Sequence, residues 1–134
     1  MLSRIVLPGD PMVEFSVRTH PDVLFAYNQN HVELVIRVEN RGQTPLWCEA
    51  DVKVPENISL SPTTALNKGR VRIGILGKKE FIEKSVRIFA NQYTAPQMYQ
   101  VEVILYAFNK DGIIETRMDK KTEIRCEVKK EESM

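Results

Sequence analysis

The stretch that decides the fold covers residues 31–55 and runs HVELVIRVENRGQTPLWCEADVKVP. Its even-numbered positions from 32 to 38 are all apolar, while the odd-numbered positions between them are mostly polar or charged. The same alternation returns from Leu46 to Val54, after the turn-forming sequence NRGQTP. Apolar residues at every second position are typical of a strand with one face on a core and the other in water. The stretch therefore predicts two strands joined by a turn.

Similar segments lie on both sides of this stretch and are separated by turn signals, of which Asp111-Gly112 is the clearest hairpin signal. They cover residues 12–17, 23–27, 70–75, 81–90, 99–108, 113–118 and 122–128. Valine and isoleucine total 25 residues against 15 for leucine and alanine, which favours strands over helices. We predict an all-β, antiparallel, two-sheet immunoglobulin-like sandwich of seven or eight strands. An up-and-down barrel is the structural alternative.

The chain has 134 residues, of which 43% are hydrophobic, and this is the size of one domain with a sizeable core. We expect a single sandwich domain over residues 1–128 and a charged, frayed tail over residues 129–134. The inward-facing positions of the alternation give the predicted core, which is Val32, Leu34, Ile36, Val38, Leu46, Cys48, Ala50, Val52, Val71, Ile73, Val101, Val103 and Leu105. In residues 81–90 the same alternation points Lys84 inward, so we expect a bulge or a snorkelling lysine there.

Several turn sequences resemble those of a known family. VENRG (38–42) and VKVPENISLSP (52–62) follow the course V-x-N-x-G and V-x-V-P-x-x-I-x-L-x-P of immunoglobulin-like accessory domains, of which the CARDB-like family of archaea and bacteria is the most similar type. The resemblance continues through ILGKKE (75–80) and QMYQVEV (97–103), although Gln97 stands where the family has glycine. It covers about residues 30–128 and implies a non-catalytic adhesion, scaffold or accessory module, without assigning site residues.

The residues offer little catalytic or metal-binding chemistry. The histidines, His20 and His31, lie in separate segments and are expected to be ordinary surface residues, so no metal site is predicted. Around Gly77-Lys78 the phosphate-loop pattern fails, because Arg72 replaces its first glycine and Lys79 replaces its serine or threonine. No serine or cysteine stands in a nucleophile motif. We therefore predict no catalytic residues, no cofactor and no enzymatic activity.

The two cysteines, Cys48 and Cys126, are expected to be buried thiols because both occupy inward-facing positions. A disulfide between their strands is the alternative. Asn57-Ile58-Ser59 matches a glycosylation sequon, which matters only if the protein is secreted.

The charges indicate which partners to expect. The net charge is +1, which gives no general attraction to nucleic acid or to an anionic membrane. Residues 68–89 contain seven basic and two acidic residues, which we interpret as protection of sheet edges, with an anionic partner as the alternative. No apolar run is long enough to span a membrane. The N-terminal sequence MLSRIVLP does not resemble a signal peptide, which favours the cytoplasm, unless a leader was removed.

One apolar patch is expected on the outside of the sandwich. If Leu46, Cys48 and Ala50 face inward, Trp47 faces outward, and the strand over 99–108 likewise presents Ile104, Tyr106 and Phe108. In an immunoglobulin-like arrangement these two strands are neighbours, so the four residues share one surface. Residues 2–7 or Ile113-Ile114 are the segments that could cover it. We predict an interaction face for a protein partner or a second copy; a carbohydrate- or polymer-binding domain is the alternative function.

Overall fold

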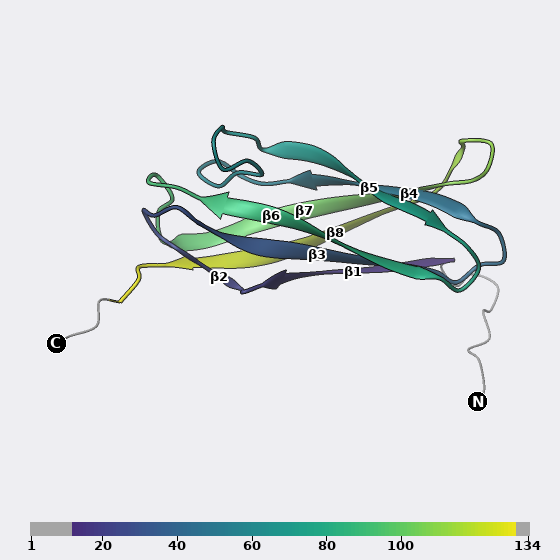
Figure 1. Ribbon diagram of the computed structural model, residues 1–134, viewed down its shortest axis with the longest axis horizontal. Coiled ribbons are helices and arrows are strands. Elements are labelled where there is room, and N and C mark those ends of the chain that lie inside the picture. The colour runs from purple at the N-terminus through teal and green to yellow at the C-terminus, as the bar shows by residue number, and fades with distance from the viewer. Residues whose placement is uncertain (1–11, 131–134) are drawn as a thin grey trace, which may run out of the picture.

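The structure, a computed structural model, describes residues 12–130. In that range it contains eight strands and no helix, so the all-β prediction is confirmed. Figure 1 shows the strands as two layers of an elongated sandwich. Their bounds are β1 (Val13–His20), β2 (Val23–Phe25), β3 (Asn30–Asn40), β4 (Leu46–Lys53), β5 (Lys68–Leu76), β6 (Phe81–Ala90), β7 (Gln97–Phe108) and β8 (Ile114–Glu127).

The strands form a three-stranded sheet in the order β1-β3-β6 and a five-stranded sheet in the order β2-β8-β7-β4-β5. All pairs are antiparallel except β2 with β8, which run parallel, so the expectation of a wholly antiparallel sandwich is wrong at this edge. β2 is only three residues long, and the chain crosses from one sheet to the other just before it. Local alternation carries no information about the direction of such a partner. The segments expected at 113–118 and 122–128 are one continuous strand, β8.

The predicted core is present between the two sheets. Every predicted core residue is buried except Val71. Val71 is only half-buried because β5 is an edge strand, but its side chain still packs against the core. Both cysteines are buried and free. Cys48 pairs with Ala107 and Cys126 with Gln97, so the two thiols lie toward opposite ends of β7 and are not strand neighbours.

Lys84 lies in the regular register of β6 opposite Ile36, and its side chain is exposed. The snorkelling alternative therefore applies rather than a bulge, because β6 is an edge strand of its sheet and leaves its inner face partly open to water. β5, the other basic strand of residues 68–89, is an edge strand of the second sheet. The basic residues of β5 and β6 thus lie along two sheet edges, where charge discourages pairing with other chains, whereas Lys78 and Lys79 lie in the turn between these strands.

The turns divide between the two ends of the sandwich. In Figure 1 the loops that follow β2, β4 and β6 gather at the left end, whereas the β7–β8 hairpin lies at the right end. The predicted hairpin over residues 109–112 is confirmed: the Asn109 side chain accepts hydrogen bonds from the amides of Asp111 and Ile113, and Gly112 has a φ of 76°.

Candidate functional site

The predicted interaction face lies on the outer side of the five-stranded sheet, where β4 and β7 are hydrogen-bonded neighbours. Their register places Trp47 opposite Phe108 and Ile104 opposite Asp51. The rings of Tyr106 and Phe108 are stacked, with centroids 6.4 Å apart. The four residues thus share one surface of adjacent strands.

Their exposure differs from the simple alternation pattern. Trp47, Tyr106 and Phe108 are half-buried, while Ile104 is only 3% exposed and offers almost no contact area. The carboxyl residues Asp51 and Asp119 pair with Ile104 on either side. Of the two segments expected to cover the face, residues 2–7 lie outside the described residues, and Ile113 and Ile114 are themselves exposed.

An apolar row crosses this face close to the β7–β8 hairpin. Trp47 pairs with Ile75 on β5 and with Phe108 on β7, and Phe108 pairs with Ile114 on β8. Ile75 is 62% exposed and Ile114 51% exposed, although both are large apolar side chains. We call Ile75, Trp47, Phe108 and Ile114 the apolar row. Sequence reasoning missed its two outer members, because a bulge on β5 and the register of β8 decide which residues lie beside Trp47 and Phe108.

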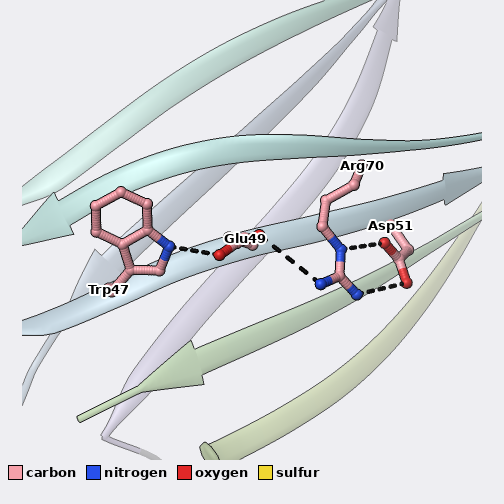
Figure 2. A network of polar contacts seen from close by, with 4 residues as sticks. All are labelled: Trp47, Glu49, Asp51 and Arg70. Carbon is pink, nitrogen blue, oxygen red and sulfur yellow. Dashed lines mark hydrogen bonds and ion pairs between the residues drawn. The ribbon is translucent and has the colours of Figure 1, made fainter. Parts of the chain in front are cut away.

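A polar network continues from Trp47 along the same face (Figure 2). The indole Nε1 donates a 2.6 Å hydrogen bond to Glu49, and Nη1 of Arg70 lies 3.8 Å from the other oxygen of that carboxylate. Arg70 also donates two hydrogen bonds to Asp51, of 2.8 and 3.2 Å. The guanidinium lies 5.2 Å from the centroid of the Tyr106 ring. The network fixes the orientation of the indole and guanidinium groups.

The network changes the electrostatic surroundings of Asp51, whose side chain is nearly buried. The hydrogen bond from Arg70 holds the pKa of Asp51 below its usual value, against the opposite effect of burial, and the charges of Arg70, Lys68 and Lys53 act in the same direction as the bond. Asp51 therefore stays ionised, and its charge is compensated on the surface of the sheet.

A second surface lies at the other end of the sandwich, where the loops after β2, β4 and β6 meet. They enclose a groove of about 540 Å³, which we call the loop groove. It is lined by three aromatic residues, four amide residues, three aliphatic hydroxyl residues and three small apolar residues: Tyr27, Phe89, Tyr93, Asn28, Gln29, Asn91, Gln92, Ser61, Thr63, Thr64, Pro62, Ala65 and Ala90. None of these residues carries a charge.

Two buried hydroxyl residues hold the three loops together. Thr94 is fully buried. Its hydroxyl accepts a hydrogen bond from the backbone amide of Asn91 and donates one to the carbonyl of Asn57. The backbone carbonyl of Thr94 accepts a hydrogen bond from the amide of Tyr27. Ser59 exchanges two backbone hydrogen bonds with Phe89, and its side chain accepts the amides of Ser61 and Leu66. Segments distant in sequence are thus fixed to one another around the groove.

The sequence contains a signal for the groove that periodicity does not detect. The three longest stretches without Asp, Glu, Lys or Arg are residues 23–32, 57–67 and 88–101, in a chain that is 28% charged. All three stretches lead into the loop groove. A search for missing charge, rather than for catalytic motifs, would have found this end of the molecule.

Other candidate residues have ordinary surroundings. Both histidines are exposed, as expected, and the His31 ring lies 5.5 Å from that of Phe89. Within residues 12–130, no three His, Cys, Asp or Glu side chains converge as a metal ion would require. Nor does that range contain a helix long and apolar enough to cross a bilayer. Asn57 of the sequon is exposed in the β4–β5 loop.

No family model matches the chain, and no curated protein matches it. Solved structures do match, and one of them is the CARDB domain of a Pyrococcus furiosus protein in complex with di-metal ions. That match has a TM-score of 0.53 and 16% identity, and covers 87% of this chain and 94% of the other. The fold is that of a CARDB domain. The sequence resemblance stated above is therefore confirmed at the level of the fold.

Two further solved structures are similar in fold to this chain. A FixG-related protein from Vibrio parahaemolyticus matches with a TM-score of 0.55 and 14% identity, over 87% of this chain and 98% of its own. AvmM, which catalyses macrocyclization in alchivemycin A biosynthesis, matches with a TM-score of 0.52 and 8% identity, over 93% of both chains. A fold shared at this level of identity does not by itself assign a function to this chain.

Proposed function

We propose that the chain is a non-catalytic, immunoglobulin-like interaction module that binds a protein, in the first instance a second copy of itself, through the outer face of its five-stranded sheet. The apolar row carries this proposal. Two large, exposed isoleucines flank a tryptophan and a phenylalanine across four adjacent strands. A contiguous exposed apolar surface of this kind is costly in water and usually marks a contact surface.

The residue types beside the apolar row support a protein partner. Tryptophan, tyrosine and arginine are the residues that most often dominate the binding energy of protein interfaces. Here Trp47 is held by Glu49, and Arg70 is held by Asp51 next to the Tyr106 ring. Because these side chains are already ordered, binding costs less conformational entropy than it would for free rotamers.

The charge pattern supports association with a second copy. Opposite charges alternate across the strands next to the apolar row: Glu49 pairs with Arg72, and Asp51 pairs with Arg70. A surface that contains both signs in neighbouring positions can be complementary to itself when two copies meet about a two-fold axis. Such a dimer would bury the apolar row at its centre and place the charges at the rim.

A non-catalytic role is supported by the state of the thiols. Burial raises the pKa of Cys48 to about 11, and burial also raises that of Cys126. A thiol becomes a nucleophile when its pKa is lowered, so these environments act in the opposite direction.

Sedimentation velocity on the purified chain tests the self-association. We expect a dimer for the wild type and a monomer for the double variant Ile75→Lys with Ile114→Lys, which adds two charges to the apolar row. Trp47→Ala with Tyr106→Ser is expected to weaken the dimer in the same way. Met98→Lys is the matched control, because Met98 is exposed on β7 away from the apolar row. A wild type that stays monomeric, or a dimer that survives both double variants, contradicts the proposal.

Recognition of a carbohydrate or another polymer, the second function expected from the sequence, is favoured by a different feature. It requires exposed aromatic rings in a groove. The half-buried rings on the outer sheet face are a poor match, whereas the loop groove has exposed tyrosines.

A further inference from the structure

We propose that the loop groove is a binding site for a neutral oligosaccharide. Its volume of about 540 Å³ falls within the range of roughly 300–1,000 Å³ that is usual for small-ligand sites. Its lining combines aromatic rings, amides and hydroxyls, and contains no charged side chain. Each of these three properties selects for a ligand that has apolar faces and many hydroxyl groups but no charge.

The aromatic residues supply flat surfaces for a sugar ring. Tyr27 is 56% exposed and Tyr93 is 69% exposed, which is unusual for side chains of this size. Phe89 also lines the groove and is half-buried. The carbon–hydrogen face of a pyranose is apolar, and an aromatic ring that packs on it removes apolar area of both from water. A tyrosine also keeps its hydroxyl available for a hydrogen bond at the rim of the contact.

The polar lining matches sugar hydroxyls. Each sugar hydroxyl can both donate and accept a hydrogen bond. The side-chain amides of asparagine and glutamine and the hydroxyls of serine and threonine can also do both. The groove has four amides and three such hydroxyls, on all three loops. A neutral ligand can therefore exchange its water contacts for protein contacts without bringing a charge into the groove.

The groove is formed in advance of binding. Tyr27 has a φ of 62°, in the left-handed region that non-glycine residues rarely adopt, and its amide is held by the carbonyl of Thr94. The side chain of Asn30 accepts the amide of Phe25 and donates to the carbonyls of Phe25 and Asn28, which fixes the same turn. Strained backbone that is held by buried neighbours is characteristic of ligand sites, because it presents a side chain in a set direction.

The lining disfavours two other ligand classes. A nucleic acid or another polyanion needs lysine or arginine at its phosphates or sulfates, and the groove provides none. A proline-rich peptide docks on aromatic grooves as well, but it has few hydrogen-bonding groups to satisfy the seven amide and hydroxyl side chains of this lining. The observations therefore favour a sugar over a peptide.

The loop groove is separate from the proposed protein interface. The apolar row lies near the β7–β8 hairpin, and the groove is lined by loops at the other end of the sandwich. Figure 1 shows the hairpin and these loops at opposite ends. A variant of one surface should leave the other unchanged, so that the failure of either proposal is recognised separately.

Isothermal titration calorimetry with purified hexasaccharides tests the proposal. The probes are cellohexaose, xylohexaose, mannohexaose and chitohexaose, with hexagalacturonate as the charged comparison and a decaproline peptide as the competing ligand class. We expect at least one neutral hexasaccharide to bind, while hexagalacturonate and decaproline do not. Tyr93→Ala and Tyr27→Asn should each weaken binding by about tenfold or more, as loss of a central aromatic contact does. Asparagine at position 27 tolerates the left-handed backbone, so that variant removes the ring without adding strain.

Two controls locate the effect. Phe81→Ala removes an exposed aromatic ring outside the groove and should leave binding unchanged, as should Trp47→Ala on the outer sheet face. In amide NMR spectra the hexasaccharide should shift the signals of Asn28, Thr63 and Gln92, which lie on the three different loops. The proposal is overturned if no neutral hexasaccharide binds, if binding survives both tyrosine variants, or if hexagalacturonate or decaproline binds more tightly.

Discussion

Asn40 joins the two sheets through a single buried side chain. Its amide nitrogen donates to the carbonyl of Leu76 at the end of β5, in the opposite sheet, and to the carbonyl of Thr44 in the β3–β4 turn. Its amide oxygen accepts the backbone amide of Gly42. Buried backbone amides and carbonyls of a turn need hydrogen-bond partners, and the Asn40 side chain supplies them here.

We expect Asn40→Ala to lower the free energy of unfolding by about 3 kcal/mol, because it leaves several buried polar groups without a partner. Urea denaturation of the wild type and the variant measures this. Gln43→Ala, an exposed position in the same turn, should change stability by less than about 0.5 kcal/mol. Equal stability of Asn40→Ala and the wild type would show that the side chain does not connect the sheets.

The two thiols should be unreactive in the folded protein. Burial raises the pKa of Cys48 to about 11 and also raises that of Cys126, so little thiolate forms near neutral pH and access is blocked. Titration with a thiol reagent should detect two groups per chain after denaturation and almost none before it. A rapid native reaction, or a mass gain of two hydrogens on reduction, is the contrary result.

At the scale of elements, the β4–β5 pair should make stability depend on acid. Asp51 has a lowered pKa in the folded state because of its hydrogen bonds with Arg70. Its contribution to stability is therefore present above the pKa of the unfolded chain, about 4, and is lost as pH falls through the lower folded value.

Asp51→Asn should consequently be less stable than the wild type at pH 6, and the difference should shrink as the pH falls below about 4. Urea denaturation across that pH range measures the difference. Glu123→Gln, an exposed position on β8, serves as the matched control and should follow the wild type. A difference that stays constant with pH would mean that the pair does not titrate with folding.

The individual strands differ in how well the sequence predicts them. β3, β4 and β7 follow from alternation alone, since each has a buried face and a polar or half-buried face. The direction of β2 and the continuity of β8 do not follow from alternation, because both depend on which distant segment supplies the hydrogen bonds. The neighbouring positions of Trp47 and Phe108 were predicted from the fold type, whereas the presence of Ile75 beside Trp47 follows from the bulge on β5 opposite Cys48 and Glu49.

For the whole molecule, the core between the sheets determines stability. Ile36 lies on the central strand of one sheet and Val103 on a central strand of the other, and both are fully buried. Replacement of either by alanine should lower the free energy of unfolding by about 2–4 kcal/mol, through lost burial and the remaining cavity. Chemical denaturation followed by circular dichroism measures this, and Ile75→Ala, at an exposed position, should have little effect on the monomer.

The loop groove marks the limit of what local sequence patterns reveal. Tyr27, Ser61 and Tyr93 lie in three separate connections, and none of them belongs to a recognisable motif. Only the assembled sandwich brings these connections to one end, through contacts such as those of Thr94 and Ser59. The strand pattern predicts the framework, whereas the surface is formed by turns whose positions depend on the complete topology.

The parallel pairing of β2 with β8 has a consequence for the order of folding. Residues 23–25 find their partners only at residues 125–127, and β8 also has to pair with β7 along most of its length. During synthesis the β1-β3-β6 sheet can pair once residue 90 is available, but its apolar inner face then has no second sheet to pack on until β4, β7 and β8 have assembled. Such non-local topologies fold in milliseconds to seconds and expose apolar surface meanwhile. The inner face of the first sheet therefore stays exposed until β8 is available to complete the second sheet.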